Sequence, residues 1–480
     1  MHVIEMIYFF ARTVPDRRAI VQGNTVTTYR GLAEIIESIG ERVDHLILNK
    51  HEPVGVCLAN PLFTLATVFA LLRNGYSAAP VNKPLLPHLA GAGIRSLIFD
   101  TEDQTISGGT NIWFDMSWLP GPRQAKMMRP YRKRAVENVG LHFFTSGTTG
   151  LPTKVVVPAA AVDQQCRYPL TLLAEAHQKV LVMAPVMGGF GFNWTCELLN
   201  IGKTAYLGSD PGVVLSLINQ YGVEVLIASP LQALMLVQLK NKNPLYRTNS
   251  LEAIFISGGK IEADGIARVR STLCRNIVRV YGITGLGRVA AMPVGPSDRA
   301  GMVPLPWVEL EIVDGVGQRQ PAGVEGRIRI RAQRLSENLK AVGPNEISGL
   351  RDGWVYPGDV GLLDDDGIIY IVGRTSDVIN RGGKTVSGAR IEEIVKELPE
   401  IRDAAACGVA GPSGLEEIWI AVVAGSGVDI DGVKQHLRRH KDVGIAPDQV
   451  FTVDHIPRGD LGKVQQHRLK EQLLALKKGA

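Results

Sequence analysis

The segment Phe143–Val157, FFTSGTTGLPTKVVV, places a short polar loop between two apolar runs. We expect a strand, a tight loop and a second strand. Glycines let consecutive backbone N–H groups converge on one anion, and hydroxyls and a lysine add donors suited to phosphate. These groups come from Thr145, Ser146, Gly147, Thr148, Thr149, Gly150 and Lys154. An ordinary turn is the alternative, but this density of donors predicts a phosphate-binding loop. It is not a Walker loop, because no Gly-Lys-Ser/Thr follows.

The length and charge of the chain limit the classes of protein to consider. A chain of 480 residues is too long for one compact core and predicts two or three domains. Its 45% hydrophobic and 21% charged residues are typical of globular proteins. The net charge of +5 is small for this length, and the densest basic run, Arg129–Arg134, is better explained by a solvated linker. Composition therefore argues against binding to nucleic acid.

The cysteines and apolar runs indicate the compartment. There are five cysteines and no CxxC pair, which predicts reduced, buried thiols and offers no metal site. They are Cys57, Cys166, Cys196, Cys274 and Cys407. No apolar run approaches the roughly 20 residues that a membrane span needs. The acidic Glu5 stands before the apolar run Met6–Ala11, unlike in a signal peptide. We expect a cytoplasmic protein without a membrane span.

Strand and helix patterns alternate on both sides of the polar loop. A hairpin is expected around Gly23-Asn24, and buried strands at Val54–Leu58 and Ala78–Val81 flank an apolar helix at Leu62–Leu72. After the loop, a helix over 160–177 leads into a second strand–helix series that extends to Val280. Strands with two apolar faces predict parallel sheets covered by helices.

The last third of the chain has a different pattern. From Trp307 onward, short strands with period-two alternation predict a small antiparallel β-subdomain. After Arg374 the pattern predicts a compact α+β domain. Its expected elements are helices over 389–397 and 430–439 and three strands between or after them.

The polar loop closely resembles the signature of the acyl-adenylate-forming superfamily, which includes acyl-CoA synthetases, adenylation domains and luciferases. Later motifs match in the family's order over most of the chain, most closely those of acyl- or aryl-CoA ligases. Thr153 separates the lysine from Pro152, where the family pattern has them adjacent. The resemblance implies an α/β fold in which residues 1–373 form two related sheets plus a β-subdomain at about 301–373. Residues 374–480 would form a small mobile α+β lid.

The resemblance also implies a nucleotide site. Tyr281 is similar to the aromatic residue that stacks on adenine, and Thr284 to a ligand of the α-phosphate. Asp359, in DGWVYPGD, would accept hydrogen bonds from both ribose hydroxyls, which suit the two oxygens of a carboxylate. The remaining implied nucleotide contacts are Gly258, Gly259, Gly282 and Arg374. A buried core tyrosine and a turn-capping aspartate are the structural alternatives for Tyr281 and Asp359.

A closing motif near the C-terminus supplies the expected catalytic lysine. The segment Ile456–Lys463, IPRGDLGK, resembles the family's terminal Pro-Lys-Thr-x-x-Gly-Lys motif. The resemblance assigns Lys463 to catalysis together with Thr284. A solvated surface charge is the alternative for an isolated lysine.

The acid is expected to bind near a glycine-rich turn at the end of a strand, where ligands of open α/β sheets lie. Candidate lining residues are Gly188, Phe190, Asn193, Trp194 and Lys260. Relatives often carry histidine or an aromatic residue where Gly188 stands, so we expect an open pocket for a compact aromatic or medium-length acid. A simple glycine turn is the alternative.

One position departs from the family pattern. Gly285 stands where relatives have a glutamate that helps hold Mg²⁺, and glycine offers no side-chain oxygen. The metal ligands are therefore unknown. If the enzyme is active, we expect a high Mg²⁺ requirement and partial relief in Gly285→Glu.

The implied function is an acid–thiol ligase. A carboxylic acid would react with ATP, in the presence of Mg²⁺, to give an acyl-AMP, and the acyl group would then pass to CoA. Loading of phosphopantetheine on an acyl carrier protein is one alternative. An impaired nucleotide-binding relative, suggested by Gly285, is the other.

Overall fold

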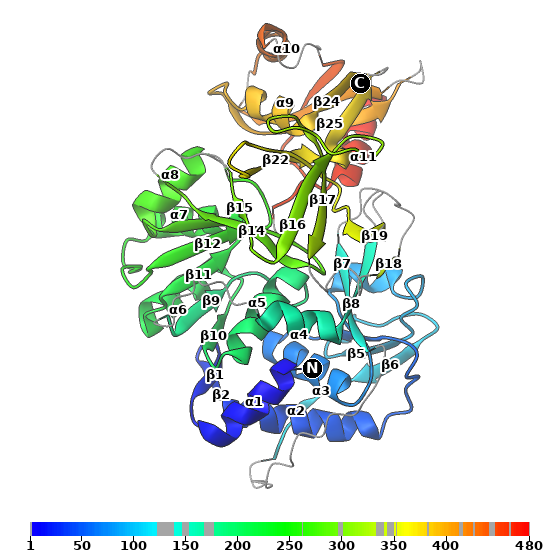
Figure 1. The fold of residues 1–480 in the computed structure, drawn as a ribbon, viewed down its shortest axis with the longest axis vertical. Coiled ribbons are helices and arrows are strands. Elements are labelled where there is room, and N and C mark those ends of the chain that lie inside the picture. The colour runs from blue at the N-terminus through cyan, green and yellow to red at the C-terminus, as the bar shows by residue number, and fades with distance from the viewer. Residues whose placement is uncertain are drawn as a thin grey trace.

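The computed structural model describes residues 2–121, 139–145, 153–167, 177–261, 263–295, 301–332, 340–342, 350–351, 353–381, 384–411, 416–425, 428–440, 447–459 and 462–479. Three sheets make up the larger part of the molecule, and a smaller C-terminal part lies at one end of it (Figure 1). No described helix is both long and apolar enough to cross a bilayer.

A nine-stranded sheet in the order β15-β14-β13-β12-β11-β9-β10-β1-β2 forms one half of the larger part. Its strands are β1 (Arg18–Gln22), β2 (Thr25–Thr28), β9 (Lys179–Val182), β10 (Thr204–Leu207), β11 (Val225–Ala228), β12 (Ala253–Ser257), β13 (Ile277–Ile283), β14 (Gly287–Pro293) and β15 (Val303–Pro304). The consecutive pairs from β1 to β13 are parallel, as the apolar faces of these strands predict. The hairpin β1–β2 confirms the turn expected at Gly23-Asn24.

A seven-stranded sheet in the order β18-β8-β7-β4-β3-β5-β6 forms the other half. Its strands are β3 (Val54–Cys57), β4 (Ala78–Pro80), β5 (Ser96–Phe99), β6 (Thr110–Trp113), β7 (Gly140–Thr145), β8 (Thr153–Pro158) and β18 (Lys340–Val342). Strands β7 and β8 are antiparallel neighbours, which confirms the strand–loop–strand prediction for the opening segment. Phosphate-loop residues 146–150 lie outside the described residues.

Helices cover these two sheets. They are α1 (His2–Thr13), α2 (Tyr29–Asp44), α3 (Pro61–Arg73), α4 (Ala159–Arg167), α5 (Gly189–Asn200), α6 (Pro211–Tyr221), α7 (Pro230–Lys242) and α8 (Ala263–Thr272), with short 3₁₀ helices at Lys83–His88 and Met116–Trp118. Prolines in the first turns of α3, α6 and α7 follow polar N-cap residues, whose side chains accept hydrogen bonds from backbone N–H groups of the first turn. The expected helix over 160–177 is described only as far as Arg167.

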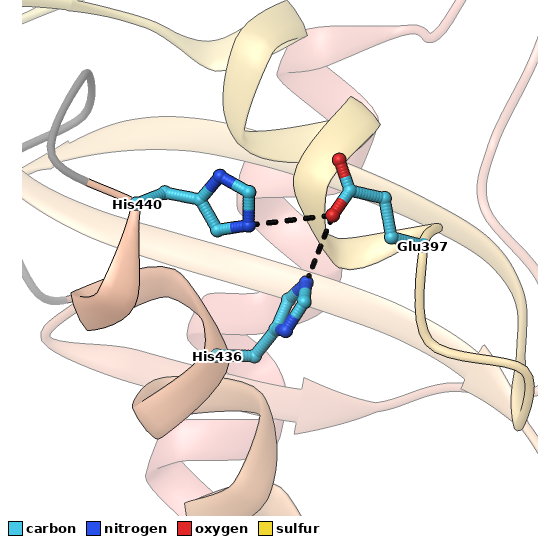
Figure 2. A group of neighbouring side chains, drawn as sticks. All are labelled: Glu397, His436 and His440. Atoms are coloured by element: carbon cyan, nitrogen blue, oxygen red, sulfur yellow. Dashed lines mark hydrogen bonds and ion pairs between the residues drawn. The ribbon is translucent and has the colours of Figure 1, made fainter.

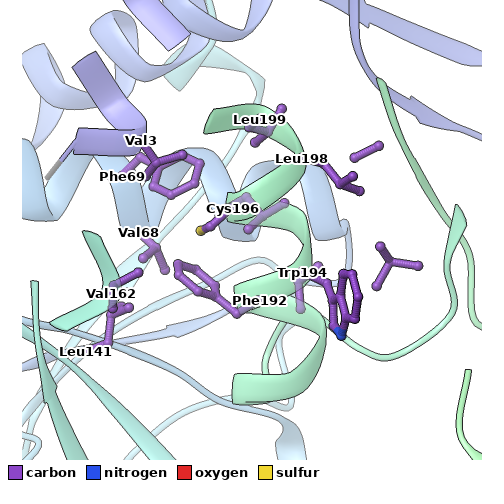
Figure 3. Packing of buried hydrophobic residues seen from close by; sticks show 14 of the residues in the cluster. Val3, Val68, Phe69, Leu141, Val162, Phe192, Trp194, Cys196, Leu198 and Leu199 are labelled. Atoms are coloured by element: carbon purple, nitrogen blue, oxygen red, sulfur yellow. The ribbon is translucent and has the colours of Figure 1, made fainter. Parts of the chain in front are cut away.

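Helix α5 joins the cores of the two sheets. Phe192 packs against Phe143 of β7 and Phe69 of α3, with ring centroids 5.6 and 6.0 Å apart. Trp194, on the same helix, packs against Phe255 of β12 at 5.6 Å. Figure 3 shows this run of buried α5 side chains among Val68, Leu141 and Val162. Because α5 is held on several sides, the polar residues that it carries are fixed in position.

The antiparallel β-subdomain contains β16 (Val308–Val313), β17 (Gly326–Ala332), β19 (Leu350–Arg351), β20 (Trp354–Val355), β21 (Asp359–Leu363) and β22 (Ile369–Arg374). Two short strands from the same stretch join the other sheets instead. Strand β15 pairs with β14, and β18 pairs with β8.

The C-terminal part follows a short 3₁₀ helix at Thr375–Asp377. It contains a β23–β24 hairpin (Val378–Arg381 and Lys384–Ser387), a sheet of β25 (Ile401–Ala410), β26 (Glu416–Ala424) and β27 (Gln449–Thr452), and helices α9 (Gly388–Val395), α10 (Ile430–Arg439) and α11 (Gln466–Gly479). The predicted fold class is confirmed, whereas the mobility of this part and the domain boundary at 374 stay predictions. The four described cysteine side chains are buried free thiols.

Candidate functional site

A cavity of about 120 Å³ lies where α5 and the ends of β12 and β13 meet the C-terminal part. Its lining includes Gly189, Phe190, Asn193, Trp194, Glu197, Ser257, Gly258, Gly282, Thr284, Arg288, Trp307 and Lys463. A wider surface depression of about 500 Å³ beside α6 contains no predicted site residue among its described lining. The smaller cavity thus brings together residues from the acid-binding, nucleotide-binding and catalytic predictions.

The topology of the nine-stranded sheet explains this convergence. Strands β12 and β13 are parallel neighbours, with Ser257 paired to Val280. Gly258 follows the carboxyl end of β12, while Gly282 and Thr284 lie at the carboxyl end of β13. Parallel neighbours present their carboxyl ends at one edge, where ligands of open α/β sheets bind.

Asp359 lies at the start of β21 and is almost fully buried, at 6% exposure. The Tyr281 hydroxyl donates a hydrogen bond to its Oδ2 at 2.5 Å, and Arg374 Nε lies 3.1 Å from its Oδ1. Burial, together with the neighbouring carboxylate, raises the pKa of Tyr281 well above its usual value, so the phenol stays protonated. Since each carboxylate oxygen has two lone pairs, Asp359 can accept further hydroxyls. Asp359, the predicted ribose ligand, thus contacts both Tyr281 and Arg374, which are predicted nucleotide contacts.

Hydrogen bonds from Arg458 hold the loop residues next to Lys463 in place. Arg458 donates to the Gly462 carbonyl at 2.8 Å and to Asp403 on β25 at 2.8 and 2.9 Å. Gly462 lies against α7, where an added Cβ would come within 2.8 Å of the Leu231 Cβ. The loop therefore bridges the C-terminal part and the larger part of the molecule.

Lys463 is exposed and lines the cavity. The surrounding protein nevertheless displaces much of the water that would solvate its ammonium group. This desolvation, helped by the positive charge of Arg374, lowers the pKa of Lys463 to about 8. Asp359 and Asp377 oppose the shift. The lysine therefore keeps its charge at neutral pH but titrates close to it.

This titration predicts a pH dependence of acid activation. Lys463 is protonated below its pKa of about 8, so kcat/KM for acyl-adenylate formation should be maintained below pH 8 and fall as the pH rises through it. The measurement is a pH–rate profile of the native chain and of Lys463→Arg, whose guanidinium stays charged. An identical alkaline fall in both proteins would assign the titration to another group.

One wall of the cavity contains a buried ion pair. Arg288 on β14 pairs with Glu197 on α5, and their side chains are 11% and 2% exposed. The Arg288 guanidinium also stacks over Trp194, with its central carbon 4.5 Å from the ring centroid. Trp194 is a predicted pocket residue, whereas no sequence motif indicated Arg288 or Glu197. The available signal was a single charged residue, Glu197, in the otherwise uncharged helix GFGFNWTCELLN.

Of the two glycines at the start of α5, Gly189 lines the cavity and Gly188 does not. Gly188 is the N-cap of α5, and an added Cβ would meet only the Pro185 carbonyl oxygen at 3.7 Å. Gly189 lines the cavity, and its added Cβ would lie 3.3 Å from Thr284 Cγ2. A side chain at Gly189 would therefore intrude on the predicted phosphate ligand.

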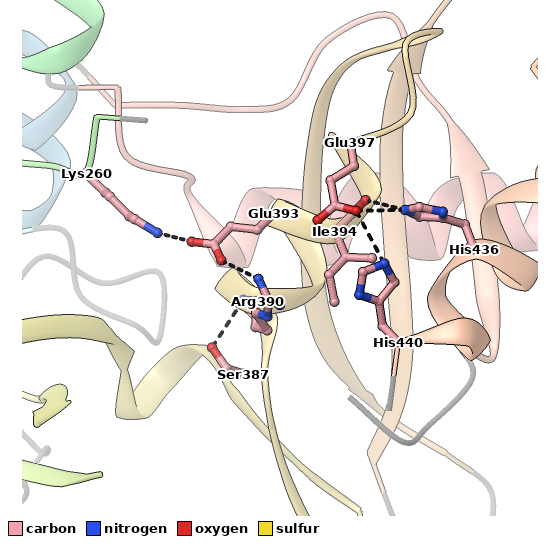
Figure 4. Close-up of polar contacts among 8 residues, drawn as sticks. All are labelled: Lys260, Ser387, Arg390, Glu393, Ile394, Glu397, His436 and His440. Atoms are coloured by element: carbon pink, nitrogen blue, oxygen red, sulfur yellow. Dashed lines mark hydrogen bonds and ion pairs between the residues drawn. The ribbon is translucent and has the colours of Figure 1, made fainter. Parts of the chain in front are cut away.

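Several predicted residues lie elsewhere. Lys154 Nζ donates to the Ala92 carbonyl at 2.6 Å, and burial lowers the pKa of Lys154. Lys260 forms an ion pair with Glu393 of α9, across to the C-terminal part (Figure 4). Gly259 is packed beside Pro230. Thr145 ends β7, but its side chain is outside the described part of the chain.

Gly285 adopts a φ of +95°. Residues with a Cβ are strained in this region, so the structure opposes the relief expected from Gly285→Glu. Among the described lining residues, Glu197 is the one carboxylate, and it pairs with Arg288. Mg²⁺ commonly binds through one or two carboxylates together with substrate phosphates and water, so at this site phosphate oxygens and water would be its main ligands.

We therefore predict that Gly285→Glu is destabilised by about 1–2 kcal/mol and keeps the native Mg²⁺ requirement. Thermal unfolding and the Mg²⁺ dependence of acid activation measure the two effects. Gly315→Glu is the control, because a Cβ there meets no atom within 4 Å and the φ is not positive. A clearly lower Mg²⁺ requirement in Gly285→Glu would show that the carboxylate reaches the ion.

Known proteins resemble this chain in sequence and in fold. The family model described as AMP-binding enzyme matches residues 9–338. The 4-chlorobenzoate–CoA ligase of an Arthrobacter species is 26% identical to this chain over 356 residues. The match covers 70% of this chain and 66% of the ligase, so the chain spans just under two thirds of the ligase's length. The feruloyl-CoA synthase of an Amycolatopsis species is 26% identical over 494 residues, covering 96% and 97%.

The structure of o-succinylbenzoate CoA synthetase from Bacillus subtilis, solved with its acyl-adenylate intermediate, is similar over 97% of this chain and 98% of that protein. The TM-score is 0.82 and the sequence identity is 20%. At this identity the likeness establishes the shared fold.

Proposed function

Because the chain belongs to the AMP-binding enzyme family, we propose that it activates a carboxylic acid with ATP and transfers the acyl group to a thiol, with CoA as the acceptor. The family match confirms the resemblance to acyl-adenylate-forming enzymes. The observation that carries the proposal is the position of Lys463, which reaches from the C-terminal part into the cavity lined by Thr284 and Gly258.

In the first half-reaction an oxygen of the substrate carboxylate attacks the α-phosphorus of ATP. The bond from that phosphorus to the bridging oxygen breaks, and pyrophosphate leaves with the electron pair. The Lys463 ammonium stabilises the charge that develops between the carboxylate and the α-phosphate, and Thr284 donates a hydrogen bond to it. Asp359 orients the ribose. Mg²⁺, when bound, neutralises phosphate charge.

In the second half-reaction the thiolate of the acceptor attacks the acyl carbon, and AMP leaves. AMP is a good leaving group, so the protein's contribution is to position the thiol and exclude water. We expect Lys463 to matter less here, because the leaving phosphate already carries its charge in the adenylate.

The acid that suits the cavity is a compact aromatic acid with a polar substituent. Phe190, Trp194 and Trp307 supply flat apolar surface. The Glu197–Arg288 pair makes one wall of the cavity charged, so an acid with a polar substituent suits that wall better than a hydrocarbon chain. The names of both sequence relatives include an aromatic acid, which supports this class.

Product analysis tests the proposal. The native chain is incubated with ATP, Mg²⁺ and either CoA or a phosphopantetheinylated carrier protein, with hydroxy- and amino-benzoates, unsubstituted benzoate and alkanoates as acids. We expect AMP and an aryl-CoA thioester, formed fastest from substituted benzoates. Thioester on the carrier alone would assign the enzyme to carrier loading, and ATP binding without AMP release would favour an impaired relative.

A further inference from the structure

Two histidines and a glutamate meet on the C-terminal part, away from the cavity. His436 is on α10, His440 caps its C-terminus, and Glu397 follows α9. Both histidine Nε2 atoms approach the same carboxylate oxygen, Glu397 Oε2, at 3.2 and 3.3 Å. Figure 2 shows the two imidazoles pointing to this oxygen from one side of α10.

The helix explains why the two histidines can act together. Residues four apart lie on the same face of a helix, and the His436 and His440 ring centroids are 5.0 Å apart. One ligand atom from each of the three side chains can be chosen so that all lie within 4.8 Å of one another. The segment that follows α9 thus supplies an oxygen at the point where the C-terminal end of α10 supplies two nitrogens.

We propose that Glu397, His436 and His440 bind a zinc-class transition-metal ion. Zinc–ligand bonds are about 2.0–2.2 Å, so ligand atoms around a tetrahedral ion are separated by about 3.3–3.5 Å. The two nitrogen–oxygen separations of 3.2 and 3.3 Å are close to this spacing, and all three ligand atoms lie within 4.8 Å of one another. Water can complete the tetrahedron, because the side chains of His436, His440 and Glu397 are 24%, 28% and 48% exposed.

The donor set selects the class of metal. Imidazole nitrogen favours zinc and related first-row ions, whereas Mg²⁺ requires oxygen ligands. This site therefore differs in chemistry from the Mg²⁺ that accompanies the nucleotide. His436 Nε2 also lies 3.1 Å from the Ile394 carbonyl oxygen, a contact that the ion would replace.

A bound ion would strengthen the connection between α10 and the end of α9, which the two histidines already join through Glu397 and the Ile394 carbonyl. Helix α9 also carries Glu393, which pairs with Lys260 of the larger part (Figure 4). An ion between α9 and α10 would therefore stabilise the element through which the C-terminal part contacts the rest of the chain. Its effect should appear as thermal stabilisation by mass action.

The test measures zinc binding to the full chain, without a histidine tag or nucleotide, after dialysis against a chelator. Calorimetry with zinc chloride should show one saturable equivalent, and zinc should raise the unfolding temperature. Each ligand is replaced in turn, in His436→Gln, His440→Gln and Glu397→Gln. Loss of a residue that only hydrogen-bonds a metal ligand weakens binding by roughly 10–100-fold, so loss of a ligand should weaken zinc binding by at least this factor. Cobalt should give the visible absorption of a tetrahedral complex.

The matched control is His467→Gln. His467 and Glu471 on α11 also form a histidine–carboxylate pair, at 3.2 Å, but this pair is not in the described three-residue cluster. Its replacement should leave zinc binding unchanged. Absence of saturable binding by the native chain, or unchanged affinity in all three ligand variants with native circular dichroism, would reduce the cluster to a hydrogen-bonded triad and overturn the proposal.

Discussion

Replacing Lys463 by alanine is expected to slow acyl-adenylate formation by about 10²–10³-fold, equivalent to about 2.7–4 kcal/mol of transition-state stabilisation. The reason is the position of its ammonium in the cavity beside Thr284. Thioester formation from a supplied acyl-adenylate should change much less. Single-turnover measurements of each half-reaction separate the two effects.

Lys434→Ala is the control for this prediction. Lys434 belongs to α10 and is not among the cavity-lining residues, so both half-reactions should keep their native rates. An equal loss in both half-reactions of Lys463→Ala would contradict a role confined to adenylation.

Removing the carboxylate of Glu197 is expected to destabilise the protein by about 3–5 kcal/mol, because Arg288 would remain buried without its counter-charge. Denaturant unfolding of Glu197→Ala measures this loss. Glu309→Ala removes a carboxylate from an exposed pair with Arg331, whose side chains are 53% and 43% exposed, and should cost only about 0–1 kcal/mol.

The double variant Glu197→Met/Arg288→Leu separates stability from substrate choice. Apolar residues of similar size can replace a buried pair with little loss of stability, so the double variant should be more stable than Glu197→Ala. It should also lose the preference for acids with polar substituents. A preserved preference would place the specificity of the site elsewhere.

The sequence predicted what local patterns determine. The β7–β8 segment, the β1–β2 hairpin and the glycine turns at strand ends are each defined by neighbouring residues. Parallel pairing of β12 and β13 then brought their terminal loops to one edge, as fold-level rules require.

Long side chains and distant partners were harder to predict. Glu197 and Arg288 are 91 residues apart, and their pairing depends on α5 lying against β14. The positions of Lys154 and Lys260 in the sequence predicted phosphate and substrate contacts, but each side chain binds a partner outside the cavity. The φ of Gly285 and the Glu397–His436–His440 cluster likewise follow from tertiary structure that no motif encodes.

Acid-dependent exchange of labelled pyrophosphate into ATP tests the central claim most directly, because it requires reversible formation of an acyl-adenylate and no thiol. The native chain, with saturating ATP and Mg²⁺, should exchange pyrophosphate only when an acid is present, and fastest with polar-substituted aromatic acids. Absence of exchange with every acid and at every Mg²⁺ concentration, while ATP still binds, would contradict the account.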